Sequence, residues 1–123
     1  MTGQITLHVQ DGIARVTIDN APVNAISRRL LLRIAEVFDS LHNHPGANVA
    51  VLTGAGDRAF CAGADFKDVG ADNWDTEDHG RSMRTGLEAI YECAIPVIAA
   101  VNGPALGGGL ALVASCDYAI ASE

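Results

Sequence analysis

Two glycine-containing segments carry the chemistry that this 123-residue sequence could perform. The first follows residues 97–101 (V-I-A-A-V), an apolar run rich in β-branched side chains that is typical of a buried strand. The turn residues N-G-P at 102–104 break the run, and three glycines at 107–109 open a segment of small residues that predicts a helix over 107–115. Glycines between a strand and a helix let the backbone turn and leave N–H groups at the helix start pointing outward. Such groups favour negative charge, either on a phosphate or on an oxyanion that forms during a reaction.

The second segment has the same order of features. Residues 49–53 (V-A-V-L-T) predict a strand, residues 54–57 (G-A-G-D) predict a turn, and F-C-A-G-A-D follows at 60–65. Residues 54–59 also match G-x-G-x-x-A, which is a dinucleotide-binding fingerprint. That motif needs a long helix to begin within it, and F-C-A-G interrupts it at once. A plain turn is therefore favoured, and a dinucleotide-binding α/β domain is the least favoured function.

Taken together, the two segments resemble a known family. F-C-A-G-A-D at 60–65, followed by V-N-G-P-A-L-G-G-G at 101–109, is similar to the crotonase superfamily, the enoyl-CoA hydratases and isomerases. The flanks N-A-P-V-N-A at 20–25 and S-C-D-Y at 115–118 agree, so the resemblance runs in order along nearly the whole chain. It implies an α/β fold with a crotonase-like spiral core of ββα turns. Because the chain is much shorter than is usual for the family, we expect residues 1–123 to be the N-terminal part of a crotonase-like acyl-CoA-binding domain, incomplete at the C-terminus.

The resemblance implies an oxyanion hole for an acyl-CoA thioester. In the family two backbone N–H groups hold the thioester carbonyl, and the matching positions here are Ala64 and Gly108, the catalytic residues that the resemblance implies. Charge develops on that oxygen as an enolate forms, so two fixed donors stabilise the transition state more than the ground state. Coenzyme A is then part of the substrate, and no metal or redox cofactor is implied. The segment that lines coenzyme A would comprise Ala62, Gly63, Ala64, Asp65, Phe66 and Lys67.

The sequence departs from the family's hydratases at the proton-transfer groups. Their first glutamate sits two residues after the triple glycine, where this chain has Ala111, and an alanine cannot transfer a proton. The second glutamate, and the later carboxylate on which related isomerases rely, would lie beyond Glu123. We therefore expect residues 1–123 alone to hydrate no short 2-enoyl-CoA. The alternative function is a catalytically silent fragment, or a CoA-binding or interaction module.

Local patterns predict the elements that position these segments. Residues 5–9 and 13–18 alternate between apolar and polar side chains around Asp11-Gly12, which predicts a hairpin. Ser27 is a good N-cap for a helix that ends near residues 44–46. A stripe at helical spacing marks the core face of that helix: Leu30, Leu31, Ile34, Val37, Phe38 and Leu41.

The second half of the chain is predicted in the same way. Residues 68–80 are polar and predict a surface loop, residues 81–93 return to helical spacing, and residues 118–121 predict a last strand. We expect the strands at 49–53 and 97–101 to be parallel neighbours, because both glycine loops must face one pocket. The last strand would lie at an open edge, which makes the isolated chain marginally stable and prone to self-association. Four aliphatic side chains are candidates to lose partners there: Leu106, Leu110, Leu112 and Val113.

Composition limits the partners and the compartment. A net charge of −7 argues against nucleic acid and anionic membranes, no run is long enough for a transmembrane helix, and the N-terminus lacks the features of a signal peptide. Three separated cysteines predict buried, reduced thiols in a cytoplasmic protein: Cys61, Cys93 and Cys116. Four histidines without metal-ligand spacing are predicted to be exposed: His8, His42, His44 and His79. The resemblance adds an acyl-CoA substrate and a homo-oligomer, a trimer or hexamer in the full-length family fold.

Overall fold

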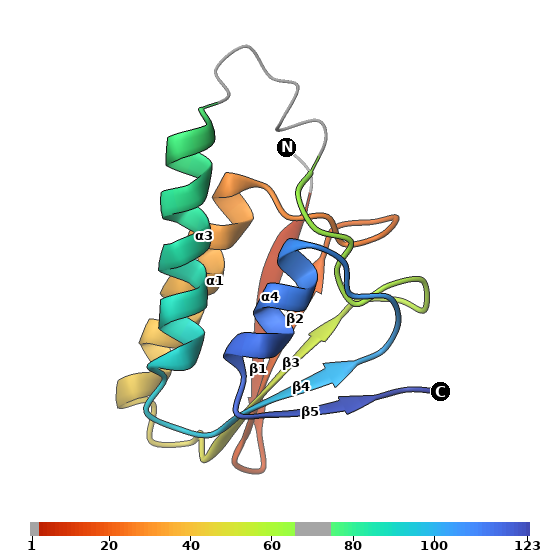
Figure 1. Cartoon of the computed structure of the whole chain (residues 1–123). Helices are drawn as coiled ribbons and strands as arrows, with labels where there is room; N and C mark the ends of the chain where they lie inside the picture. The colour runs from red at the N-terminus through yellow and green to blue at the C-terminus, as the bar shows by residue number, and fades with distance from the viewer. Residues whose placement is uncertain (1–2, 66–74) are drawn as a thin grey trace.

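A single mixed sheet organises the chain, and the computed structural model describes residues 3–65 and 75–123. The strands lie side by side in the order of the sequence (Figure 1): β1 (Gln4–Gln10), β2 (Ile13–Asp19), β3 (Val49–Gly54), β4 (Val97–Val101) and β5 (Tyr118–Ala121). β1 and β2 are antiparallel, whereas β3, β4 and β5 each run parallel to the strand before them. The predicted α/β class and the parallel pairing of β3 with β4 are confirmed.

The β1–β2 hairpin follows from its turn sequence. Asp11 and Gly12 both have positive φ, at 54° and 81°. Two left-handed residues in sequence form the tight turn whose twist matches that of antiparallel strands. The predicted hairpin is therefore confirmed.

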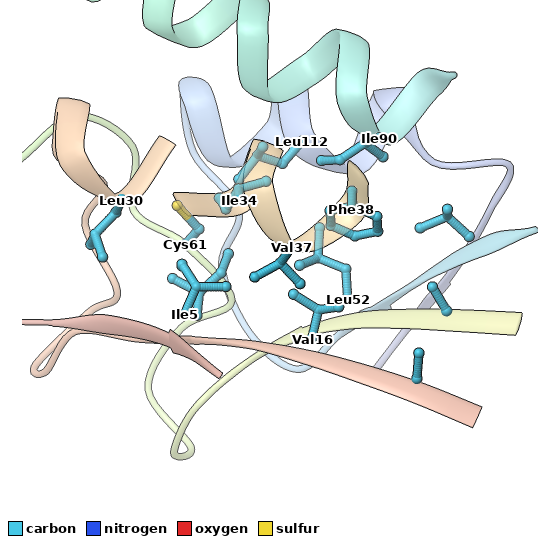
Figure 2. Close-up of a cluster of buried hydrophobic side chains, with 14 of the residues drawn as sticks. Ile5, Val16, Leu30, Ile34, Val37, Phe38, Leu52, Cys61, Ile90 and Leu112 are labelled. Atoms are coloured by element: carbon cyan, nitrogen blue, oxygen red, sulfur yellow. The ribbon is translucent and has the colours of Figure 1, made fainter. Parts of the chain in front are cut away.

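The helices α1 (Arg28–Ser40), α3 (Thr76–Tyr91) and α4 (Gly108–Ser115) lie on one side of the sheet (Figure 1). The hydrophobic core fills the space between these two layers, where side chains of α1 meet alternate residues of the strands (Figure 2). On β2, for example, Ala14, Val16 and Ile18 are fully buried. Such alternation is expected of a sheet that is covered on one face.

Helix α1 begins where its sequence predicts, but it ends at Ser40, before the predicted end near residues 44–46. The Ser27 hydroxyl accepts a hydrogen bond from the Leu30 N–H at 3.2 Å, so the predicted N-cap is present. After Ser40 a single 3-10 turn, η1 (Leu41–Asn43), continues the chain to His44. All six residues of the predicted apolar stripe are buried. The stripe therefore forms the centre of the core.

Helix α3 begins earlier than predicted, so part of the predicted loop is wrong. The Asp75 carboxylate accepts hydrogen bonds from the N–H groups of Glu77 and Asp78, and the helix starts at Thr76. Acidic side chains in a first turn also interact favourably with the helix dipole. Residues 76–80 are thus helical, residues 68–74 of the predicted loop lie outside the described residues, and the helix ends two positions before Cys93.

The last strand lies at the open edge of the sheet, as predicted, and all four of its residues are exposed. Several large apolar side chains in this region are more than half exposed: Leu106 and Leu110 at 58%, Ile120 at 59% and Tyr118 at 65%. Leu112 differs, because it is fully buried in the core, and its expected loss of partners is wrong. Val113 is half-buried and packs against the same core.

Candidate functional site

The two glycine segments emerge from the same edge of the sheet. β3 and β4 are paired in parallel, with Thr53 opposite Ala100. The loops that follow Gly54 and Val101 therefore leave neighbouring strands at their carboxyl ends, which is where ligands bind in open α/β sheets. This arrangement brings the F-C-A-G-A-D segment beside the triple glycine.

Backbone hydrogen bonds hold the F-C-A-G-A-D segment between two neighbours. On one side Cys61 pairs with Ala105, because the Cys61 N–H donates to Pro104 O and the Leu106 N–H donates to Cys61 O. On the other side Ala64 pairs with Ile26 through the residues that flank it: the Ile26 N–H donates to Gly63 O at 2.7 Å and the Asp65 N–H donates to Ile26 O at 2.9 Å. In a parallel pair of this kind the N–H of the central residue points away from its partner. The Ala64 N–H therefore faces away from Ile26.

A tight turn sets the direction of the Gly108 N–H. Gly107 has φ 54° and ψ −120°, and the Gly109 N–H donates to Leu106 O at 2.8 Å. These values are those of a type II′ turn, in which glycine is required at the first central position. The turn uses the Gly109 N–H and leaves the Gly108 N–H, at its second central position, directed outward.

The two segments approach each other closely at these N–H groups. A Cβ placed on Gly63 would lie 2.9 Å from the Leu106 carbonyl oxygen and 3.6 Å from the Gly108 nitrogen. Ala64 follows Gly63 directly, and both Ala64 and Gly108 are half-buried. Among the hydrogen bonds of the described residues, none uses the N–H of Ala64 or of Gly108. Within the described residues, each of the two segments therefore has one backbone N–H without an acceptor.

The remaining residues predicted to line coenzyme A are only partly described. Ala62 donates its N–H to Val23 O at 3.1 Å, and the Asp65 carboxylate lies 3.5 Å from the Asn20 side-chain nitrogen. Ala62 to Asp65 thus form one continuous segment bound along residues 23–26. Phe66 and Lys67 lie outside the described residues.

Buried asparagines, which sequence reasoning missed, hold the loop after β3. Asn24 is buried, and its side-chain amide donates to Ala55 O and Ala59 O at 3.0 Å each, while its oxygen accepts from the Asn20 N–H. Asn20 donates to Ala25 O at 2.6 Å. The sequence that could have pointed to this role is N-A-P-V-N-A at 20–25, but its two asparagines were interpreted only as loop residues.

The three cysteines differ in how deeply they are buried. Only Cys61 is buried, whereas Cys93 and Cys116 are half-buried, so the predicted burial holds for one of the three free thiols. Burial raises the pKa of the Cys61 thiol to about 11, although a backbone hydrogen bond at Gly63 lowers it slightly. A neutral thiol is a poor nucleophile, so Cys61 serves packing rather than chemistry.

The predicted exposure of the histidines is correct for His8 and His42 and wrong for the half-buried His44 and His79.

Ala111 lies in the first turn of α4, three residues after Gly108, and its N–H donates to Gly107 O. Residues three apart share a helix face, so its methyl group lies on the same side of α4 as Gly108.

The structure does not support a dinucleotide-binding fingerprint at residues 54–59, because no helix begins between Gly54 and Asp65. In the described part of the chain, no group of three or more His, Cys, Asp or Glu could hold a metal ion, and no helix is long and apolar enough to cross a membrane.

A surface hollow lies close by but is not the candidate site. Its volume is about 410 Å³, and neither Ala64 nor Gly108 lines it. Its walls come from the end of β2 and from the loops after β2 and β3: Asp19, Ala21, Pro22, Asn24, Ala55, Gly56, Asp57 and Arg58. Because this hollow is open and mixes both signs of charge, it identifies no ligand class.

Comparisons with known proteins identify the family of the chain. The family model described as "Enoyl-CoA hydratase/isomerase" matches residues 8–123. A (7aS)-7a-methyl-1,5-dioxo-2,3,5,6,7,7a-hexahydro-1H-indene-carboxyl-CoA hydrolase from Rhodococcus jostii is 39% identical over 115 residues, which are 92% of this chain and 44% of the hydrolase. A carnitinyl-CoA dehydratase from Proteus mirabilis is 34% identical over 123 residues, which are 100% of this chain and 47% of the dehydratase.

Solved structures show the same fold. The crystal structure of an enoyl-CoA hydratase from Bacillus anthracis superposes with a TM-score of 0.87 at 32% identity, covering 98% of this chain and 47% of that one. The crystal structure of an enoyl-CoA hydratase/isomerase family member superposes with a TM-score of 0.85 at 35% identity, covering 98% and 48%. The chain thus spans about half the length of the relatives it matches, and its fold is the crotonase fold in incomplete form. On the family match over residues 8–123 and on this shared fold, the chain belongs to the enoyl-CoA hydratase/isomerase family.

Proposed function

We propose that this chain binds an acyl-CoA thioester and that the N–H groups of Ala64 and Gly108 donate hydrogen bonds to its carbonyl oxygen. The observation that carries the proposal is the close approach of the two segments, with a Cβ on Gly63 only 3.6 Å from the Gly108 nitrogen. Family membership supports the substrate class, and two relatives carry names of enzymes that act on CoA esters.

The proposed chemistry is stabilisation of an enolate. When a proton leaves the carbon next to the thioester carbonyl, the C–H electron pair moves into a carbon–carbon double bond and the carbonyl oxygen becomes negative. Hydrogen bonds to a charged acceptor are roughly twice as strong as those between neutral groups. Two preorganised donors therefore favour the enolate over the thioester, and removing one such donor from an enzyme typically costs about 100-fold to 1,000-fold in rate.

Ala111 bears on the reaction that the whole protein catalyses. It matches the position of the first glutamate of the family's hydratases, and a methyl group holds no proton. We therefore propose that residues 1–123 polarise a thioester without hydrating it. Turnover of a short 2-enoyl-CoA by residues 1–123 alone would contradict this assignment.

Isotope-edited infrared spectroscopy tests the oxyanion hole. A 13C-labelled thioester carbonyl should absorb at lower frequency when the acyl-CoA is bound, because the two donors weaken its double bond. Gly108→Pro removes the N–H donor and should remove most of this shift. A carbonyl shift that survives Gly108→Pro would overturn the proposal.

Gly108→Ala is the matched control for that experiment. A Cβ at this position would lie 2.6 Å from the Met83 Cε, so alanine and proline both force this flexible side chain to move. Alanine, however, keeps the N–H. Gly108→Ala should therefore retain the shift that Gly108→Pro loses.

A further inference from the structure

We infer that Asn102 is a positioning residue that fixes the separation of the two donors. The inference rests on the proposed function, and it concerns a residue whose side chain lies between the loop after β3 and the loop after β4. Asn102 directly follows β4 and is half-buried. It contacts the neighbouring loop through its carboxamide, so it joins two segments that are far apart in the sequence.

Both the nitrogen and the oxygen of the Asn102 carboxamide form hydrogen bonds. Its nitrogen donates to Gly54 O at 3.0 Å and to Gly56 O at 3.1 Å, with Ala59 O at 3.4 Å. Its oxygen accepts the Gly54 N–H at 3.1 Å. Because carbonyl oxygens surround the nitrogen and an N–H faces the oxygen, only one orientation of the amide satisfies these groups. The side chain therefore specifies a single arrangement of the two loops.

The Ala59 carbonyl links this contact to the site. It accepts from Asn102 and also from the buried Asn24 at 3.0 Å, so the loop is held from both sides. The backbones touch at the same point, because a Cβ on Gly103 would lie 2.9 Å from the Ala59 Cα. Position 59 therefore has little freedom to shift relative to the loop after β4.

A shift at Ala59 would reach the donors directly. The next residue, Phe60, donates its N–H to Pro104 O at 3.1 Å, and Cys61 then pairs with Ala105. Two residues further on, Gly63 lies against Gly108. Since this segment is short and bonded to both neighbours, displacing its start moves the Ala64 N–H relative to the Gly108 N–H.

Asn102→Asp is the sharpest test, because aspartate has nearly the same shape. It replaces the donating nitrogen by an oxygen that faces two or three carbonyl oxygens, which should push the loop after β3 away. We expect Asn102→Asp to lose most of the infrared shift of a bound 13C-labelled thioester while still binding free coenzyme A, which has no thioester carbonyl.

Thr53→Val is the matched control. The Thr53 hydroxyl donates to Ala100 O at 2.9 Å and to the Asn102 side-chain oxygen at 3.4 Å, so it also joins β3 to β4, one residue before Gly54. Valine has the same shape and removes both bonds, but it leaves the bonds from the Asn102 nitrogen to Gly54, Gly56 and Ala59 in place. Thr53→Val should lower the melting temperature yet keep the full carbonyl shift. An unchanged shift in Asn102→Asp, or equal losses in both variants, would overturn the inference.

A measurement without ligand separates this inference from the proposed function. Amide hydrogen exchange and 15N chemical shifts should change at residues 59–64 and at Gly108 in Asn102→Asp, but only near β3 and β4 in Thr53→Val. If the unmodified chain shows no carbonyl shift, the proposed function fails while this measurement still tests Asn102. If Asn102→Asp and Asn102→Ala both lose the circular dichroism of the fold and Thr53→Val keeps it, Asn102 is a structural residue and the inference is wrong.

Discussion

Gly107, Gly108 and Gly109 differ in what a side chain at each position would meet. Gly107 has φ 54°, and a Cβ there would meet nothing within 4 Å, so only the backbone conformation requires glycine. Gly108 faces the flexible end of Met83. A Cβ on Gly109 would overlap the carbonyl oxygen of Cys61. The triple glycine therefore combines a turn, a donor and a close contact between helix α4 and the F-C-A-G-A-D segment.

Gly109→Ala should destabilise the chain, because rigid backbone must move to admit the methyl group. Overpacking of this kind costs about 1–3 kcal/mol. Gly80→Ala is the control: Gly80 is exposed within α3 with no atom near its Cβ position, and alanine in a helix should stabilise by about 0.5–1 kcal/mol. Urea unfolding of both variants checks the prediction, and equal midpoints would contradict it.

The thiols of Cys61 and Cys116 predict a loss of stability at alkaline pH. Burial raises the pKa of Cys61 from 9.0 to about 11 and that of Cys116 to about 12, and Asp117 adds to the shift of Cys116. Between these pH values the folded state keeps thiol protons that the unfolded state releases. The thiol contribution to the free energy of unfolding is therefore complete below pH 9.0 and is lost as pH rises through about 11. The urea midpoint should fall over this range, and less steeply in the double variant Cys61→Ala, Cys116→Ala. Parallel pH profiles would show that the thiols contribute nothing.

At the scale of elements, the beginning of α3 depends on a polar cap. The first buried residue of α3 is Ser82, so the apolar pattern gives no sign of the helix start at Thr76. The Asp75 carboxylate instead supplies the acceptor for two N–H groups. Asp75→Ala should cost about 1 kcal/mol, whereas Asp75→Ser retains a capping oxygen and should cost much less. Equal melting temperatures for the two variants would contradict a capping role.

Elements specified by residues close together in the sequence were predictable from it. Contacts between residues far apart in the sequence were not. Asp11-Gly12 specifies the hairpin and the Leu30–Leu41 stripe specifies α1, because each pattern repeats within a few residues. The side-chain bonds of Asn102 reach back more than 40 positions to Gly54 and Gly56, and they leave no local pattern. Leu112 was misassigned for a related reason: in an all-apolar helix the sequence does not say which face meets the core. The donor positions Ala64 and Gly108 came from the family resemblance and stay predictions.

At the scale of the whole molecule, the exposed apolar side chains near β5 predict self-association. Tyr118 and Ile120 lie on an edge strand whose backbone groups have no neighbour on one side in the described sheet. Ile120→Lys should shift sedimentation towards the monomer, because a charged side chain disfavours edge pairing. Leu32→Lys is the control, since Leu32 is also an exposed aliphatic residue but lies on α1. If the unmodified chain sediments as a monomer at every concentration, with a sharp and reversible melt, the predictions of association and marginal stability are both wrong.

The spatial order of the sheet has a consequence for how the chain is made. Because β1 to β5 lie side by side in sequence order, each strand emerging from a ribosome finds its partner already synthesised. Domains fold as they are produced from the N-terminus, so this sheet can grow one strand at a time. Ala64 is placed by Ile26, which precedes it, whereas Gly108 arrives only after β4 has paired. The second of the two proposed donors is therefore added after the first, and a nascent chain halted before Gly108 would carry only the first.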